Sequence, residues 1–366
     1  MTDFDKLTNM EIANWRLRNQ RLVGDRWNDP VEVVRGLLCV QAENFSQSGW
    51  ALATRCDPAP TEQNVHDLFD AGRILRTHVI RPTWHYALPD DIVWLTELTG
   101  PRVHKSFIRS QQISEGITDL QRDQMVDCAV GAIETDGPLT RDQVRERLAD
   151  AGLPTSGAAL ILTMGMAETS ALVCSGPRRD GAQTYALMSE RAPNARRLDP
   201  DDALAELTMR YVAGHGPVTE HDLSYWATQT LTTVRKGLVA ISEAITSFEH
   251  NGLTYWHLRD DEPPSTVQPS AHILQILDEM YRGYHKDSRL VLDSANIVPH
   301  GRETSIGMVL ADTQFVASMN RRLTDSEVEF ALGPYRPLAD EELTALCEVA
   351  DAYGRYCGRS ATVTID

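Results

Sequence analysis

The segments TDGPLTRDQVRERLADAGL (residues 135–153) and GHGPVTEHDLSYWATQT (residues 214–230) repeat one pattern along the chain. Each has Gly-Pro, then an apolar residue, then a threonine followed closely by an acid or an amide. Gly-Pro marks a turn and threonine is a common N-cap, so we expect helices to begin after Thr140 and Thr219. Because Gly216 lies 79 residues after Gly137, the sequence predicts one structural unit that occurs twice.

The sequence around each cap is also parallel. After the first cap, a helical pattern at 155–170 precedes two apolar runs that flank the turn GPRRDG at 176–181. After the second cap, a helical pattern at 231–245 precedes two runs that flank His250-Asn251-Gly252. Both pairs of runs predict β-hairpins. With first helices at 121–135 and 201–214, the order is helix, turn, helix, turn, helix, hairpin, which is typical of a winged-helix module.

The two ends of the chain predict further units. Helices near 10–23, after Asp29 and near 61–71, with the strand-like RTHVIRPTWHYAL (76–88), predict a third winged unit whose wing carries Arg81, Thr83 and His85. DDEPPSTVQPSA (260–271) reads as a linker. Beyond it we expect short strands at 288–293, 304–312, 313–322, 327–332 and 361–365, and a helix at 340–356.

These patterns together predict an α+β fold. We expect winged-helix units at 1–120, which carries the sequence QAE, at 121–198 and at 199–262, followed by a small β-barrel-like domain with a helix at 263–366. A chain of 366 residues is too long for one ordinary core. The division into several units fits that length.

Composition narrows the class of protein. No run of about 18 apolar residues exists and the N-terminus lacks a signal-like pattern, so we expect a cytoplasmic protein with no membrane partner. A formal charge of −17 argues against a chain that coats nucleic acid non-specifically, although arginine pairs at 178–179, 196–197 and 321–322 allow a local basic groove. The six cysteines are scattered without metal-ligand spacing, so we expect reduced thiols, no metal and no cofactor.

The sequence QAE at 41–43 interrupts a helical pattern. Apolar residues recur at steps of three and four from Val31 to Leu38, and the next position on that stripe is Gln41. On one continuous helix Gln41 and Glu43 would be about 160° apart, so they could not share a site. In an extended segment they would lie on the same side. A joint role therefore requires the helix to end near Val40 or Gln41.

Each of these residues also has a structural interpretation. Gln41 would then be a buried amide bonded to a helix end. His85 would be an interior histidine whose ring nitrogens bond backbone groups. The pair Arg178-Arg179 would be no more than a solvated turn.

The motifs converge on one family. The chain resembles the winged-helix DNA glycosylases of the AlkZ and YcaQ type in NWRLRNQRL (14–22), GLLCVQAE (36–43), HVIRPTWHYALPDDIVWL (78–95), both Gly-Pro-x-Thr segments, ILDEMYRGYHKDSR (276–289), RRL with VEFAL (321–332) and EVADAYGRYCG (348–358). The resemblance implies tandem winged-helix units around a concave, DNA-sized channel. It also implies excision of alkylated purines, including bulky lesions and interstrand crosslinks.

The family's Gln-x-Gln or Gln-x-Asp motif falls on Gln41 and Glu43. The sequence departs from the family pattern in two places, with glutamate at position 43 and with Asn320 where relatives usually show tryptophan. Glutamate is one methylene longer than the aspartate of one branch and is charged where the other branch has an amide.

A chemical hypothesis follows for QAE. Purines alkylated at N7 or N3 carry a positive charge and are good leaving groups, so no general acid is needed. A carboxylate stabilises the developing sugar cation and accepts a proton from the attacking water. We assign that role to Glu43, and to Gln41 the orientation of the water or the sugar-phosphate. The expected partner is alkylated or crosslinked double-stranded DNA bound by a monomer in an open channel, with contacts from Arg81, Thr83, His85, Arg178, Arg179, Arg321 and Arg322.

Two other functions fit the same sequence. A non-catalytic winged-helix DNA-binding protein or regulator would keep the arginines, but Glu43 would be paired in a salt bridge or turned away from the DNA. A protein-interaction scaffold would lack a continuous basic groove.

Overall fold

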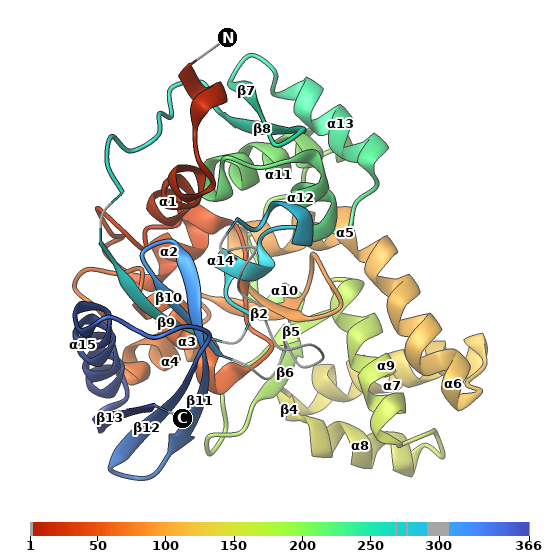
Figure 1. Cartoon of the computed structure of the whole chain (residues 1–366). Coiled ribbons are helices and arrows are strands. Elements are labelled where there is room, and N and C mark those ends of the chain that lie inside the picture. The colour runs from red at the N-terminus through yellow and green to blue at the C-terminus, as the bar shows by residue number, and fades with distance from the viewer. Residues whose placement is uncertain (1–2, 268, 276, 291–306, 366) are drawn as a thin grey trace.

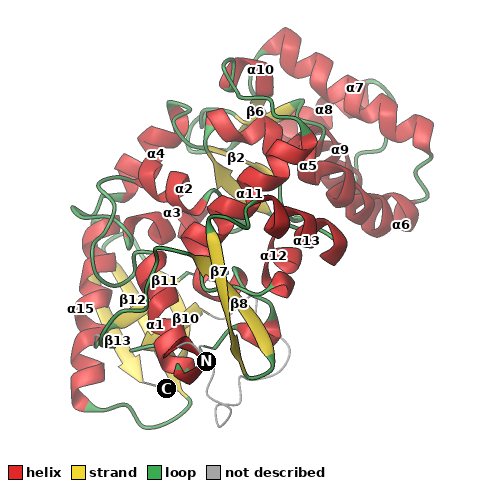
Figure 2. Ribbon diagram, turned by 90° about the horizontal axis from the view of Figure 1, so that it is seen from above, coloured by secondary structure: helices red, strands yellow, loops and turns green. Residues whose placement is uncertain are grey.

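The computed structural model describes residues 3–267, 269–275, 277–290 and 307–365. Helices and strands mix along the chain in an α+β fold (Figure 1). Helices α6 (Ile113–Glu115), α7 (Asp119–Asp136), α8 (Arg141–Asp150) and α9 (Gly157–Thr169) gather at one end of the molecule. The C-terminal sheet lies with helix α15 (Asp340–Cys357) at the opposite end (Figure 2).

The two repeated segments form the same sequence of elements. The first runs α7, β4 (Leu139–Thr140), α8, α9, β5 (Val173–Ser175) and β6 (Thr184–Leu187). The second runs α11 (Pro200–His215), α12 (Glu220–Trp226), α13 (Leu231–Ala240), β7 (Ile245–His250) and β8 (Leu253–Leu258). Strand β4 pairs with β6, and Val218 forms the corresponding bridge to Trp256. The expected helices and both hairpins are confirmed.

The caps explain why these helices begin where they do. Thr140 accepts a hydrogen bond from the backbone N–H of Gln143, and Thr219 accepts one from that of Asp222, in two capping boxes. The second hairpin turns at Asn251 and Gly252, whose φ angles of 50° and 77° suit a tight turn of the type that asparagine-glycine favours. Local sequence therefore fixes the start of each helix and the turn of this hairpin.

The N-terminal region contains more structure than its pattern indicated. Its elements are α1 (Asn9–Asn19), α2 (Pro30–Leu37), β1 (Val40–Gln41), α3 (Phe45–Ala53), α4 (Glu62–Asp70), β2 (Leu75–His78), β3 (Trp84–Ala87) and α5 (Pro89–Phe107). A π-helical turn at Ile108–Gln112 leads from α5 into α6. Strands β1, β3 and β2 form a small antiparallel sheet in that order. Helix α3 and strand β1 were not expected.

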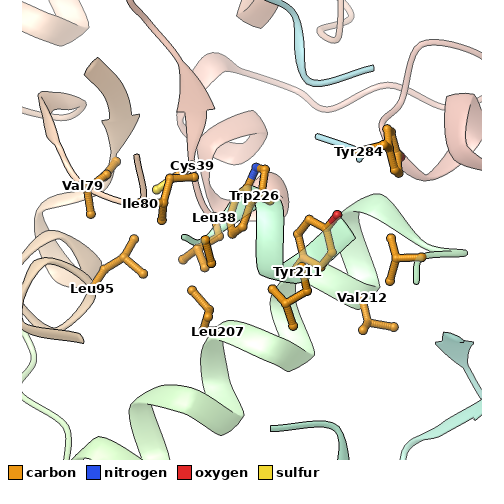
Figure 3. Packing of buried hydrophobic residues seen from close by; sticks show 14 of the residues in the cluster. Leu38, Cys39, Val79, Ile80, Leu95, Leu207, Tyr211, Val212, Trp226 and Tyr284 are labelled. Carbon is orange, nitrogen blue, oxygen red and sulfur yellow. The ribbon is translucent and has the colours of Figure 1, made fainter. Parts of the chain in front are cut away.

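The hydrophobic cores cross the unit boundaries expected from the sequence. Helix α1 packs against the β7–β8 hairpin through Ile12 and Trp15, which contact Phe248 and Tyr255 in one buried cluster. A larger cluster joins the region after α2 to the second repeat. In Figure 3 its members Leu38 and Cys39 lie near Trp226, with Val79 and Ile80 on one side and Tyr211 on the other.

The C-terminal region forms a five-stranded open sheet. Its order is β13 (Ser360–Ile365), β12 (Glu327–Pro334), β11 (Gln314–Leu323), β10 (Gly307–Ala311) and β9 (Ala271–Leu274). All neighbours are antiparallel except β12 and β13. Helix α15 shares a buried cluster with these strands through Leu346 and Tyr353.

The strand expected at 288–293 is wrong in part. Residues Lys286–Ser288 form a 3-10 turn and no strand follows through Leu290, while 291–293 lie outside the described residues. The fifth strand of the sheet is β9 instead, at the end of the expected linker.

The cysteines and the apolar helices bear on two expectations that were drawn from composition. All six cysteines are free thiols. Among the residues that the structure describes, no helix is both long and apolar enough to cross a bilayer. The remaining described elements are a 3-10 helix at Asp3–Lys6 and the short helices α10 (Met188–Arg191) and α14 (Glu279–Arg282).

Candidate functional site

The backbone changes direction just before QAE. Helix α2 ends at Leu37, and Leu38 has a φ of 66°, which an L-residue adopts only with strain. Gln41 then lies in β1, where it pairs with His85 of β3. The helix therefore ends before Gln41, which meets the geometric condition for Gln41 and Glu43 to act together.

Gln41 is 2% exposed and lies in a polar network. Its Nε2 donates to the hydroxyl of Thr83 at 3.0 Å, and its Oε1 accepts from the backbone N–H of Glu43 at 2.7 Å. Its carbonyl oxygen accepts from Nε2 of Gln275 at 3.2 Å. Gln41 thus contacts polar groups of three separate segments. Its amide is buried, and its side chain contacts the backbone of Glu43.

Glu43 is held by its backbone while its side chain stays exposed. The Arg76 guanidinium donates to the carbonyl oxygen of Glu43 at 3.2 Å and to that of Ala42 at 2.8 Å. The backbone N–H of Trp84 donates to the Glu43 carboxylate at 3.1 Å. This arrangement fixes the segment and leaves the carboxylate accessible to solvent.

A second carboxylate, Glu279 of α14, anchors QAE from inside the protein. It is fully buried and accepts the backbone N–H of Gln41 at 2.9 Å. Trp226 Nε1 donates to its other oxygen at 2.9 Å, and His215 Nε2 donates to the same oxygen at 3.4 Å. Burial by itself raises the pKa of Glu279, but the His215 hydrogen bond and the nearby Arg81 charge outweigh burial and hold the pKa at about 2.

Sequence reasoning missed Glu279. It lies in ILDEMYRGYHKDSR, which carries part of the family resemblance. Nothing in its local pattern distinguishes this glutamate from the many that face solvent, because its partners are 238 residues away at Gln41 and 53 at Trp226. Only the tertiary structure identifies it.

His85 lies in the interior of the protein. Its side chain is fully buried, its Nδ1–H donates to the carbonyl of Thr83 at 2.8 Å, and its Nε2 accepts from Arg81 at 3.1 Å. Burial, reinforced by the Arg81 charge, lowers the pKa of His85 to about 3. His85 is thus an interior histidine, as its structural interpretation expected, and its contact with DNA stays a prediction.

Arg81 lies next to this histidine and is 8% exposed. Its guanidinium donates to the carbonyl oxygen of Arg282 at 2.8 Å and lies 4.0 Å from the Glu279 carboxylate. These contacts point the Arg81 charge inward, and its contact with DNA stays a prediction. Thr83 is half-buried, and its hydroxyl accepts from Gln41. All three residues thus brace QAE.

The other predicted arginines lie on different elements. Arg178 forms a two-pronged ion pair with Asp70, with contacts of 2.7 and 3.1 Å to one carboxylate oxygen, whereas its neighbour Arg179 is exposed. Arg321 packs over the ring of Tyr353 at 5.4 Å, and the exposed Arg322 pairs with Glu329 at 3.1 Å. Their contacts with DNA stay predictions, and Arg179 and Arg322 are the two exposed enough to make them.

Among the residues that the structure describes, no group of three or more His, Cys, Asp or Glu side chains is arranged to hold a metal ion.

Comparisons with known proteins agree on one relationship. A family model described as "DNA glycosylase AlkZ-like" matches residues 34–356, a range that includes QAE and Glu279. The solved structure of Streptomyces sahachiroi DNA glycosylase AlkZ is similar, with a TM-score of 0.77 and 18% sequence identity over 99% of this chain and 100% of that chain. At that identity the structural likeness concerns the fold alone. No curated protein matches the sequence.

Proposed function

The chain belongs to the AlkZ-like DNA glycosylase family, and we therefore propose that it hydrolyses the N-glycosidic bond of alkylated purines in double-stranded DNA. The substrates proposed first are N7-alkylguanine and N3-alkyladenine, whose positive charge makes the base a good leaving group. Bulky adducts and interstrand crosslinks, which the family resemblance implies, form a second set. The observation that carries the proposal is the exposed Glu43 carboxylate, held in place beside Gln41.

The chemistry assigned to Glu43 is electrostatic and acid–base. As the glycosidic bond breaks, positive charge develops on the sugar, and an adjacent carboxylate stabilises it. The same carboxylate accepts a proton from the water that attacks the sugar. No base protonation is required, because the leaving purine is already cationic.

Gln41 keeps its proposed role in orienting that water or the sugar-phosphate. A glutamine amide has two donor hydrogens and two acceptor lone pairs. In Gln41, one hydrogen is used by Thr83 and one lone pair by the Glu43 backbone. The remaining hydrogen and lone pair are available for a water or a DNA oxygen, in an amide whose orientation is already set.

DNA binding is proposed for the two repeats as winged-helix units, with the chain divided at 120, 198 and 262 as the sequence predicts. The order of helices and hairpins in both repeats supports this assignment. We propose that Arg179 and Arg322 contact phosphates along a concave channel. A monomer with several such units spans a duplex without a partner chain.

The test is a glycosylase assay on duplex oligonucleotides that carry N7-methylguanine, N3-methyladenine or an N7-linked crosslink, with abasic sites revealed by alkali. Wild type is compared with Gln41→Ala and Glu43→Ala. Loss of roughly 10²-fold or more in excision, with duplex affinity retained, is the expected result for Glu43→Ala. Excision by Glu43→Ala at the wild-type rate would overturn the assignment.

The non-catalytic DNA-binding function makes a different prediction about Glu43. It requires a carboxylate that is paired or turned away. Within the described part of the chain, the side-chain contact found for Glu43 is the Trp84 backbone N–H, and no ion pair involves it. This observation argues against the form of the alternative in which Glu43 is paired in a salt bridge. Duplex binding without excision of any lesion would favour the non-catalytic function.

A further inference from the structure

A cavity of about 500 Å³ lies between helices α3 and α15 and the edge strand β9. Figure 1 shows α15 beside α3 and β9, at the left of the molecule. Neither Gln41 nor Glu43 belongs to the lining of the cavity, so the proposed chemistry does not assign a function to it.

Short side chains make the space. Alanines line the cavity from every element that frames it, namely Ala53 of α3, Ala271 of β9, Ala311 of β10, and Ala345 and Ala352 of α15. Pockets for small organic ligands measure roughly 300–1,000 Å³, and this cavity lies within that range. Its walls are apolar and its size fits a ligand of one or two rings.

His272 of β9 is a buried polar residue of this lining. Its side chain is 5% exposed, and within the described part of the chain its Nε2 has no hydrogen-bond partner. Burial, with the nearby charges of Arg26 and Arg55, lowers the pKa of His272 to about 3, so the ring is neutral at neutral pH. Buried polar atoms are nearly always paired, and a polar group of a bound ligand would supply the missing hydrogen bond.

The Trp50 ring adds an aromatic surface. Trp50 is 4% exposed and lines the cavity from α3, while its Nε1–H donates to the carbonyl oxygen of Ile273 at 2.7 Å. Because its polar atom is already paired, Trp50 offers the cavity only ring carbons. Aromatic rings and cations both bind favourably against such a surface.

Charge separates the possible ligands. Four carboxylates and one cation line the cavity, and these residues are Asp312, Glu341, Glu342, Glu348 and Arg26. Glu342 is neutralised by Arg336 at 2.6 Å. Glu341 and Glu348 are exposed, and among the described residues no ion pair involves either. The remaining negative charge attracts a cation and repels phosphates and carboxylates.

We propose that this cavity binds a small heteroaromatic cation. The ring of the ligand packs against Trp50 and the alanines, and a ring nitrogen forms a hydrogen bond with His272. The charged amine lies at the opening, close to Glu341 and Glu348. This site is separate from QAE, and the proposal does not rest on the glycosylase function.

The test measures binding to the full-length protein by isothermal titration calorimetry with three probes of one shape. Tryptamine carries an ammonium group, 3-propylindole has a methyl group in its place, and indole-3-propionate carries a carboxylate. We expect tryptamine to bind with a dissociation constant of about 1 mM or lower, and the other two probes to bind about tenfold more weakly or worse.

Charge variants test the opening of the cavity. Glu341→Gln combined with Glu348→Gln removes two charges with little change of shape, so tryptamine affinity should fall about fivefold while that of 3-propylindole is unchanged. Glu134→Gln combined with Glu146→Gln is the matched control. It makes the same change of net charge at exposed positions of α7 and α8, at the opposite end of the molecule from α15 (Figure 2), and should bind tryptamine as wild type does.

A size variant tests the location. Ala345→Phe places a ring in the cavity from α15, so tryptamine affinity should fall by about tenfold or more. Thr344→Phe adds a ring at the neighbouring exposed position, which is outside the lining, and should bind normally. Thermal unfolding checks that both variants keep the fold, and the charge variants test the site independently of Ala345→Phe.

Three results would overturn the proposal. The first is a wild type that binds tryptamine no more tightly than about 10 mM. The second is equal affinity for tryptamine and indole-3-propionate, which would remove the preference for a cation. The third is tryptamine binding that neither Ala345→Phe nor the pair of glutamine substitutions at 341 and 348 weakens, which would place the ligand elsewhere.

Discussion

The backbone N–H of Gln41 donates a hydrogen bond of 2.9 Å to the carboxylate of Glu279, which lies 238 residues later in the chain. The same carboxylate accepts hydrogen bonds from Trp226 of α12 and from His215 at the end of α11. One buried charge thus connects the candidate catalytic segment to the second repeat. Changes at Glu279 should therefore affect chemistry as well as stability.

Glu279→Gln is expected to slow excision. Gln41 and Trp226 donate to different oxygens of Glu279, and in glutamine one of these positions is an NH2 group that cannot accept. One buried N–H is left unpaired, which costs about 1–3 kcal/mol of unfolding free energy. The measurement is single-turnover excision together with thermal unfolding and duplex affinity.

Trp226→Phe is the matched control for Glu279. It removes the indole N–H that Glu279 accepts and leaves the Gln41 bond intact. We expect this variant to lose stability but to excise at close to the wild-type rate. Equal excision losses in the two variants would show that Glu279 acts through stability alone.

Thr83→Val tests the orientation of Gln41. The change removes the hydroxyl that accepts from Gln41 Nε2 at 3.0 Å and keeps the shape of the side chain. Because the amide loses its fixed partner, we expect excision to fall by about tenfold, equivalent to ~1.4 kcal/mol, without a change in duplex affinity. Thr83→Ser retains the hydroxyl and should excise normally, so an equal loss in Thr83→Ser would contradict the argument.

His272 of β9 should make stability depend on pH. Burial, with smaller contributions from Arg26 and Arg55, lowers its pKa to about 3 from an ordinary value of 6.5. Between pH 6.5 and 3 the unfolded chain binds a proton that the folded chain excludes, so the free energy of unfolding falls as pH falls through this range.

The measurement for His272 compares urea unfolding of wild type and His272→Phe at pH 7 and pH 5. At ~1.36 kcal/mol per pH unit, His272 accounts for about 2 kcal/mol of the wild-type loss between pH 6.5 and 5. The variant should therefore lose about that much less on acidification. The same loss in both proteins would mean that His272 is protonated in the folded state.

Arg178 and Arg179 should differ in DNA binding although they are adjacent. Arg179 is exposed, whereas Arg178 is paired with Asp70 at 2.7 Å. If Arg179 contacts a phosphate, Arg179→Ala weakens duplex binding and reduces the slope of log affinity against log salt by about one. Arg178→Ala should change this slope less. A larger effect at Arg178 would mean that the Asp70 pair opens on DNA.

The sequence predicted those parts of the fold that local rules determine. The N-caps Thr140 and Thr219 and the turn at Asn251 follow from short-range hydrogen bonding and backbone preference, and they were confirmed. The end of α2 before Gln41 could be stated as a condition, because the polar residue broke an apolar stripe. Such features need no knowledge of distant segments.

The parts that were missed depend on contacts between distant segments. The alternation in IRPTWHY could not show that His85 points inward, since its burial comes from packing and from Arg81. Glu279 and strand β9 gain their roles from Gln41 and β10, which are far away in the chain. Residue type and spacing alone do not predict these tertiary contacts.

The packing of α1 on the β7–β8 hairpin also constrains the order in which the molecule assembles. Trp15 stacks on Phe248 at a centroid separation of 6.2 Å, although 233 residues separate them. During synthesis, the first helix leaves the ribosome long before its partner exists, so its apolar face stays exposed until β8 has emerged. The contacts of α1 are therefore non-local and form late, and an apolar face that is exposed in the meantime favours aggregation of the nascent chain.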